Sequence, residues 1–314
     1  MKRRFVALLG AAATAGGLLT GCGSDGPGGA GDGAPELVAS FYPLQFVTQR
    51  IAGDRAEVRS LTPPGAEPHD LELAPKDIAA VGEADLVVYL RNFQPSVDEA
   101  VSDEAADAGL DVAPAARLDL TATDEHEGEE AAAAGDVEPE GPGRDPHFWL
   151  DPTRLATVAE QTAVKLGEAD PAHKADFTAR AAALSTELKT LDGEFTSGLK
   201  TCERHELVTS HTAFHYLADR YGLTQIGITG IDPESEPSPQ RLAAVAEEAK
   251  EHGATTIFFE TLVSPKVAET LAREVGAQTA VLDPLEGLTD ENADYFSVMR
   301  ANLTALTTAL GCDS

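Results

Sequence analysis

Short apolar runs and amphipathic stretches alternate along most of this 314-residue chain. Residues 37–40 form an apolar run, residues 44–52 carry apolar side chains at helical spacing, and residues 56–61 return to an extended pattern. This alternation predicts an α/β fold in which parallel strands are connected by helices. The same rhythm predicts helices at 76–81 and 97–108 and strands at 84–90 and 116–120.

The middle of the chain interrupts this rhythm. Residues 121–145 are mainly Asp, Glu, Ala, Gly and Pro, with one histidine, His126, and almost no large apolar side chain. Such a composition predicts a disordered, solvated loop. A helix is expected at 152–166, followed by a long one at 171–200, where apolar residues recur every three or four positions. A helix of about 30 residues is about 45 Å long, enough to extend along two lobes.

A second α/β series follows the long helix. Its strand patterns lie at 206–210, 224–229, 255–260 and 278–282, and its helical patterns at 213–221, 239–252, 265–275 and 295–310. The two halves share this rhythm without a residue-level repeat. We therefore predict an α/β protein with two lobes of parallel sheet flanked by helices, at 37–168 and 202–314, joined by one long rigid helix at 169–201.

The N-terminus has the pattern of an export signal. Lys2, Arg3 and Arg4 precede an apolar run of small residues at 5–19, and the stretch L-T-G-C ends at Cys22. This pattern is typical of a bacterial lipoprotein signal peptide, here residues 1–21, with Cys22 as the acylated first residue of the mature protein. The run is shorter than the roughly 20 residues that span a membrane. We expect a lipid-anchored protein on the extracytoplasmic face of the cell membrane, with residues 22–36 as a flexible tether.

Charge and cysteine content narrow the function classes. The chain has 23 basic and 53 acidic residues and a net charge of −30, which repels nucleic acid. We attribute the acidity mainly to solubility of an exposed protein rather than to concentration of cations.

Cys202 and Cys312 remain as an even pair in an exported chain, so a disulfide is expected. A thiolate metal site is the weaker alternative, because neither cysteine has a close partner ligand.

Three histidines directly follow predicted element boundaries. His69 ends the rigid loop P-P-G-A-E-P-H after a strand, and His147 lies in D-P-H-F-W-L-D-P beside the only tryptophan of the chain. His211 follows the first strand of the second half, at the carboxyl end where open α/β sheets bind ligands. Read singly, each could be an ordinary loop residue. Together they indicate a metal site.

Two further features bear on this site. His211 and His215 form an H-x-x-x-H pair, but position 212 is Thr and not the Glu that a zinc hydrolase of that type needs as general base. A carboxylate would complete the ligand set, and both Glu260 and Asp283 follow strands of the second half. Either acid could instead interact with a helix N-terminus, so the residues alone leave this choice open.

With these motifs in order, the sequence resembles the zinc- and manganese-specific cluster (A-I) of solute-binding lipoproteins that serve ABC transporters. The resemblance covers residues 36–312 and rests on five stretches: P-P-G-x-x-P-H, D-P-H-x-W-L-D-P, the strand followed by His211, F-x-E-x-x-x-S-P, and L-D-P-L. It implies two α/β lobes bridged by one rigid helix, with a metal held in the cleft between them.

The resemblance also implies the ligands. It places them on His69, His147, His211 and Asp283, with Glu260 as a supporting residue or alternative ligand. In the family the third ligand tends to be a carboxylate in manganese binders and a histidine in zinc binders, so His211 favours Zn²⁺, in agreement with the preference of zinc for imidazole. The acidic loop matches the position of a histidine-rich loop in many zinc members, but with only His126 we favour a plain insertion.

The sequence thus predicts a non-enzymatic, monomeric carrier that captures Zn²⁺ as its transported ligand and delivers it to an ABC permease and its ATPase. It would bind no nucleic acid and contact the membrane only through its lipid anchor. One alternative is a manganese-binding member of the same family. Another is a zinc-dependent hydrolase, which would need an open metal position beside a general base. A surface adhesin is compatible with the anchor but explains none of the histidines.

Overall fold

The computed structural model describes residues 33–121, 143–290 and 292–313. The predicted signal peptide, Cys22, most of the tether and His126 lie outside these residues. Within them, no helix is both long enough and apolar enough to cross a membrane.

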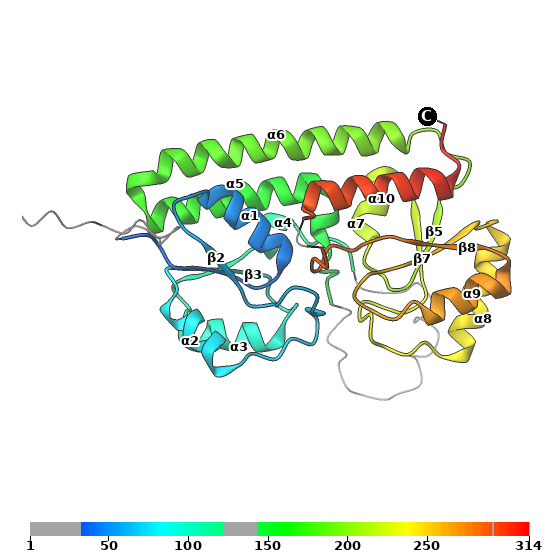
Figure 1. Cartoon of the computed structure of the whole chain (residues 1–314), viewed down its shortest axis with the longest axis horizontal. Coiled ribbons are helices and arrows are strands. Elements are labelled where there is room, and N and C mark those ends of the chain that lie inside the picture. Colours follow the sequence, from blue (N-terminus) through cyan, green and yellow to red (C-terminus); the bar gives the residue numbers. More distant parts are fainter. Residues whose placement is uncertain (1–32, 122–142, 291, 314) are drawn as a thin grey trace, which may run out of the picture.

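Two four-stranded parallel sheets form the two lobes (Figure 1). Both sheets have the same strand order. In each sheet the first strand lies between the second and third strands, and the fourth strand lies at one edge. The first sheet consists of β1 (Leu37–Ala39), β2 (Val58–Ser60), β3 (Leu86–Tyr89) and β4 (Gly109–Asp111). The second consists of β5 (Glu206–Thr209), β6 (Thr224–Gly227), β7 (Thr256–Phe259) and β8 (Gln278–Val281).

Helices connect the strands and cover the sheets, as the alternating pattern predicts. In the first lobe these are α1 (Tyr42–Ala52), α2 (Pro75–Glu83), α3 (Pro95–Glu104) and the single turn α4 (Ala113–Ala116). In the second lobe they are α7 (His215–Tyr221), α8 (Pro239–Glu251), α9 (Lys266–Val275) and α10 (Tyr295–Leu310). The predicted fold class, two lobes of parallel sheet flanked by helices and joined by a long helix, is confirmed.

The long helix is α6 (Lys174–Gly198), and it runs along both lobes (Figure 1). It follows α5 (Pro152–Ala169) and a short 3-10 turn at Pro171–His173, so it begins slightly later than the predicted start at residue 171. Its 25 residues give a length of about 37 Å. Its predicted apolar positions are all buried: Phe177, Ala181, Leu184, Leu188, Leu191 and Phe195. This stripe explains why the helix is held against the lobes along its length.

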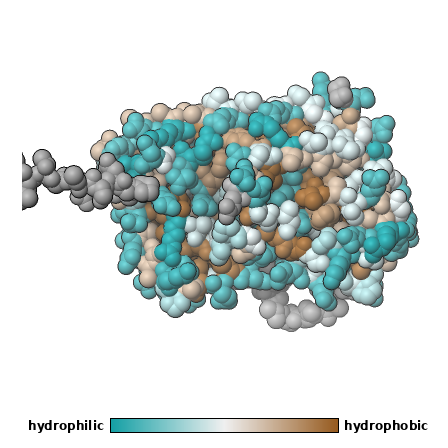
Figure 2. Space-filling model, in the orientation of Figure 1, coloured by the Kyte–Doolittle hydropathy of each residue, from teal (hydrophilic) through white to brown (hydrophobic). Residues whose placement is uncertain are grey.

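One large hydrophobic core extends across both lobes. It includes Phe41 and Trp149 from the first half of the chain and Phe214 and Tyr295 from the second. The ring of Phe46 on α1 stacks on that of Tyr295 on α10 with centroids 5.3 Å apart. Smaller clusters fill the opposite faces of the two sheets, under α2 and α3 in the first lobe and under α8 and α9 in the second. The shared core holds the two lobes together, and hydrophilic residues cover much of the outer surface (Figure 2).

One predicted element is wrong. The strand expected at 116–120 is absent, and the fourth strand of the first sheet is β4, at Gly109–Asp111. Pro114 lies in the first turn of α4, where its fixed φ favours a helical turn, and Arg117 ends that turn with a φ of 54°. Of the apolar residues that suggested a strand, Ala116 is buried as the last residue of this turn, and Leu118 and Leu120 follow it and pack half-buried against the core.

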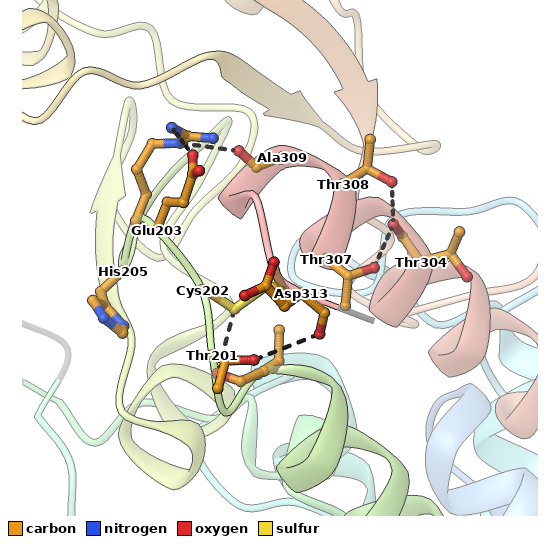
Figure 3. The surroundings of a disulfide bond; sticks show 12 residues. Thr201, Cys202, Glu203, His205, Thr304, Thr307, Thr308, Ala309 and Asp313 are labelled. Atoms are coloured by element: carbon orange, nitrogen blue, oxygen red, sulfur yellow. Dashed lines mark hydrogen bonds and ion pairs between the residues drawn. A yellow bond between two sulfur atoms is a disulfide. The ribbon is translucent and has the colours of Figure 1, made fainter.

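The cysteines link the end of α6 to the end of α10. Cys202 and Cys312 are joined as a disulfide (Figure 3). The two segments also exchange backbone hydrogen bonds. The amide of Asp313 donates to the Thr201 carbonyl over 3.0 Å, and that of Glu203 donates to the Leu310 carbonyl over 3.1 Å. The crosslink closes a chain separation of 110 residues, so it restrains most of the second lobe in the unfolded chain.

We therefore expect the double substitution Cys202→Ser and Cys312→Ser to lower the free energy of unfolding by about 2–4 kcal/mol. Urea denaturation followed by circular dichroism would measure the loss. A reducing agent should destabilise the unsubstituted protein by a similar amount and leave the double variant unchanged. Equal stability of the two proteins under oxidising conditions would contradict a stabilising crosslink.

Candidate metal centre

Four side chains from separate loops converge between the lobes: His69, His147, His211 and Glu286. One potential ligand atom from each lies within 4.8 Å of the others. His69 follows β2, His147 precedes α5, His211 follows β5 and Glu286 follows β8, so both lobes contribute. A cleft of about 580 Å³ between α1, the loop after β2 and the loop after β8 reaches Glu286. Three of the four side chains thus follow strands of the two sheets, which is where an α/β fold is expected to bind ligands.

His69 lies on a loop that hydrogen bonds from neighbouring residues hold in place. The buried amide of Gln94 donates to Thr62 Oγ1 over 3.0 Å and to the Pro68 carbonyl over 3.1 Å. The Glu67 carboxylate accepts the backbone N–H of His69 over 2.9 Å. The His69 ring contacts the edge of Phe93 with centroids 4.7 Å apart. His69 is 10% exposed, whereas the other three side chains are at most 1% exposed, so it is the member nearest to solvent.

His147 is fixed by the acid two residues before it. Asp145 Oδ1 accepts the backbone N–H of His147 over 2.9 Å and lies 2.8 Å from its Nδ1. A carboxylate only accepts hydrogen bonds, so Nδ1 carries the proton and Nε2 faces the group. Trp149 packs beside the ring, with centroids 5.2 Å apart, and keeps water from that side.

His211 has an equivalent support from the second lobe. Its Nδ1 lies 2.8 Å from Glu260 Oε1, which also accepts the Ser210 hydroxyl over 2.8 Å. Its Nε2 therefore faces the group, 3.3 Å from Glu286 Oε1. Glu260 thus holds a ring of the group and does not belong to the group itself.

Glu286 lies at the centre of the group. Its Oε1 is 2.9 Å from His147 Nε2, 3.3 Å from His211 Nε2 and 3.4 Å from His69 Nε2. The loop is positioned by Trp149, whose indole N–H donates to the Pro284 carbonyl over 2.7 Å, and by Leu285, whose φ is 59°. Two buried atoms of the group, Glu286 Oε2 and His211 Nε2, have no hydrogen-bond partner within the described part of the chain. Burial of such atoms is unfavourable unless something binds them, which is what a metal ion would do.

The charges of the group are strongly interdependent. Burial alone would raise the pKa of Glu286, but the adjacent imidazoles, His211 foremost, hold it well below its usual range. Burial alone would lower the pKa of His211, but the carboxylates of Glu260 and Glu286 outweigh that effect and raise it to about 10. The pKa of His147 is also raised, because Asp145 and Glu286 together outweigh its burial. Without a metal, protons thus take the place of a cation between these carboxylates.

The predicted fourth ligand, Asp283, is not in this group. Its Oδ1 accepts the backbone N–H of Leu285 over 2.8 Å, and its Oδ2 accepts the Thr261 hydroxyl over 3.0 Å. Asp283 therefore shapes the turn that presents Glu286, which takes the place expected for Asp283. The sequence signal was close: the L-D-P-L stretch is followed immediately by this acid. The left-handed backbone of Leu285, which a pattern of residue types does not reveal, decides which carboxylate faces the imidazoles.

The other candidates lie elsewhere. His215 contacts Asp145 and is outside the group, as are the half-buried Cys202 and Cys312. The predicted lipidation site, Cys22, falls outside the residues that the structure describes.

Comparison with known proteins then decides the family. The family model described as component A, periplasmic, of the zinc-uptake complex (ZnuA) matches residues 37–309. The chain belongs to this family. The resemblance inferred from the five motifs is therefore confirmed.

Individual relatives agree with this assignment. The high-affinity zinc uptake system protein ZnuA of Bacillus subtilis is 36% identical over 304 residues, which cover 93% of this chain and 94% of that protein. The zinc-binding lipoprotein AdcA of Streptococcus pneumoniae is 36% identical over 285 residues, 88% of this chain but only 56% of AdcA. The chain thus spans about half the length of AdcA.

Solved structures give the same result for the fold. The Zn(II)-bound ZnuA-like domain of Streptococcus pneumoniae AdcA is 34% identical, with a TM-score of 0.71, and the match covers 88% of this chain and 99% of that domain. The laminin-binding protein Lmb of Streptococcus agalactiae, described as bifunctional with adhesin and metal-transporting activity, is 34% identical with a TM-score of 0.77, and the match covers the same shares of the two chains.

Proposed function

We propose that this protein is the extracytoplasmic zinc-binding component of an ABC importer, which captures Zn²⁺ and delivers it to a membrane permease. The observation that carries the proposal is the convergence of three imidazole Nε2 atoms on one buried carboxylate, all within 4.8 Å. Three nitrogen donors and one oxygen donor suit the tetrahedral coordination of zinc. The metal is cargo, so the ligands have to bind it tightly and also release it.

The donor set favours zinc over manganese. Manganese prefers more oxygen donors, whereas this group offers three imidazoles, of which His211 is the third. Carboxylates behind His147 and His211 fix the ring tautomers and make the facing nitrogens more basic, as is usual for imidazoles that bind metals. The relatives named for zinc uptake or zinc binding support the same choice.

The position of the ligands supports a transport role. The first lobe supplies His69 and His147 and the second supplies His211 and Glu286, so metal binding draws the lobes together and favours one arrangement by differential affinity. A permease with its ATPase would recognise that arrangement. α6 is packed against the shared core and limits how far the lobes can separate.

The arrangement of carboxylates favours a carrier over a zinc hydrolase. A hydrolase needs an acid beside the metal that is free to act as general base. Among the described residues, the acids that contact the three histidines, apart from Glu286 itself, are Glu67, Asp145 and Glu260, and each of them holds a ring or a backbone N–H.

We also propose that the mature chain is a monomer anchored to the membrane through acylated Cys22. The support is the sequence pattern before Cys22, together with the description of AdcA as a lipoprotein. The tether of residues 22–36 would keep the two lobes near the permease without a spanning helix.

Substitutions of Glu286 and Asp283 show which of these two acids in the loop after β8 binds the metal. Glu286→Gln should weaken zinc binding at least about 100-fold, because the negative charge of a buried ligand is lost and only a neutral amide oxygen remains. Asp283→Asn is the matched control: its side-chain oxygen can still accept the Leu285 N–H and keep the turn, and it is not one of the four converging side chains, so affinity should stay within about threefold of the unsubstituted protein. Competition with a chelating dye would measure both. The reverse order of effects would restore Asp283 as the ligand.

Zinc binding should release protons. The pKa of His211 in the metal-free protein is about 10, so at pH 7 zinc has to displace a proton from this ring. Apparent affinity should therefore increase as pH rises from 6 towards 9, about tenfold per pH unit for each proton released. Calorimetry at one pH in buffers of different ionisation enthalpy would count these protons. Identical heats in all buffers would show that none is released.

A further inference from the structure

His215 lies beside the metal centre but is not one of its four side chains. It is the second histidine of the H-x-x-x-H pair and the first residue of α7. Its Nδ1 lies 3.0 Å from Asp145 Oδ2, on the side of the carboxylate opposite to His147. The two histidines of the pair therefore have different positions in the site. His211 belongs to the group itself, whereas His215 contacts the carboxylate that holds His147.

Asp145 is surrounded by donors from both lobes. It is completely buried, and its carboxylate contacts His147 through Oδ1 and His215 through Oδ2. Its carbonyl accepts the hydroxyl of Tyr216, the residue after His215, over 3.2 Å. The guanidinium of Arg154 lies over the Tyr216 ring, 4.5 Å from its centroid, and holds α7 against the first lobe. The orientation of Asp145 is thus determined by the docking of α7.

The direction of the hydrogen bonds follows from the chemistry of a carboxylate. Both oxygens of Asp145 can only accept, so both imidazoles donate from Nδ1. This holds whether His215 is neutral or charged, because Nδ1 carries a hydrogen in both cases. If His215 were lost, Oδ2 would be a buried anionic oxygen without a donor, and the carboxylate would turn or take up a proton. Either change would loosen the ring of His147.

We infer that His215 is a positioning residue for zinc binding: through Asp145, it fixes the tautomer and orientation of His147 from the opposite lobe. The inference rests on the proposed function. It differs from the support of His211, where, among the residues that the structure describes, Glu260 Oε2 has no hydrogen-bond partner and no second histidine contacts the carboxylate. The carboxylate behind His147 is therefore held by both lobes, whereas the carboxylate behind His211 contacts residues of its own lobe.

Four variants test this role. His215→Leu removes the donor and keeps the bulk, and it should lower zinc affinity about tenfold, as the loss of residues that orient metal ligands does. His215→Asn places an amide N–H near the position of Nδ1 and should restore affinity to within about threefold, because the donor is replaced. His252→Ala is the control, since His252 lines the same polar cleft as His215 but pairs with Glu206 and not with Asp145. Its affinity should equal that of the unsubstituted protein.

The fourth variant, Asp145→Ala, shows whether His215 acts through Asp145. In that background His215→Leu should have no further effect on zinc affinity. A purely structural role would instead lower the melting temperature of the metal-free protein without changing zinc affinity. Should His215→Leu not fold, His215→Ala removes the same donor at a side chain that is 23% exposed.

The outcomes separate this inference from the proposed function. Unchanged affinity in His215→Leu, or an equal loss with and without Asp145, would overturn the role of His215 while zinc binding stands. An unsubstituted protein that binds no zinc would overturn the proposed function and this inference together.

Discussion

The buried carboxylate of Glu286 is the constraint on which the rest of the site depends. Its side chain is fully buried, and removing an ionised carboxylate from water costs several kcal/mol unless opposite charge and hydrogen bonds compensate. The compensation comes from three imidazoles that belong to different segments of the chain. Since these segments lie in both lobes, neither lobe can satisfy Glu286 alone. The site therefore links the docking of the lobes to the charge at its centre.

The surroundings of the group follow from this requirement. Each of the two fully buried rings has a carboxylate at its Nδ1, which directs the Nε2 atom towards Glu286. Trp149 donates to the loop that carries Glu286, and Tyr295 donates to the Trp149 carbonyl over 2.7 Å. These two hydrogen bonds fix the position of the second half of the chain relative to the first. The position of Asp145, between His147 and His215, extends the same linkage to α7. A cation at the centre would replace protons on the histidine rings that lie between Glu286 and the supporting carboxylates. The rings of His147 and His211 would move least, because these carboxylates already fix them.

Much of the fold could be predicted from the sequence because it depends on local periodicity. The apolar stripe of α6 and the alternation of strands and helices are properties of neighbouring residues, and the structure has them nearly where expected. β4 was missed because Gly109–Asp111 is short and adjoins a helix, whereas Pro114 and Arg117 turned the next apolar residues into a helical turn. The three histidines were identified because each follows an element boundary. Glu286 and the role of Asp145 could not be predicted in the same way: one depends on the left-handed backbone of Leu285, the other on contacts between residues 70 positions apart.

The central claim is that three imidazoles and one carboxylate of this chain bind zinc. The most direct measurement is the zinc K-edge X-ray absorption spectrum of the two-lobe protein purified without chelator. We expect a stoichiometric zinc signal with three imidazole ligands and one oxygen ligand at about 2.0–2.1 Å. A protein without a zinc edge, or a zinc spectrum with fewer than three imidazoles, would contradict the account.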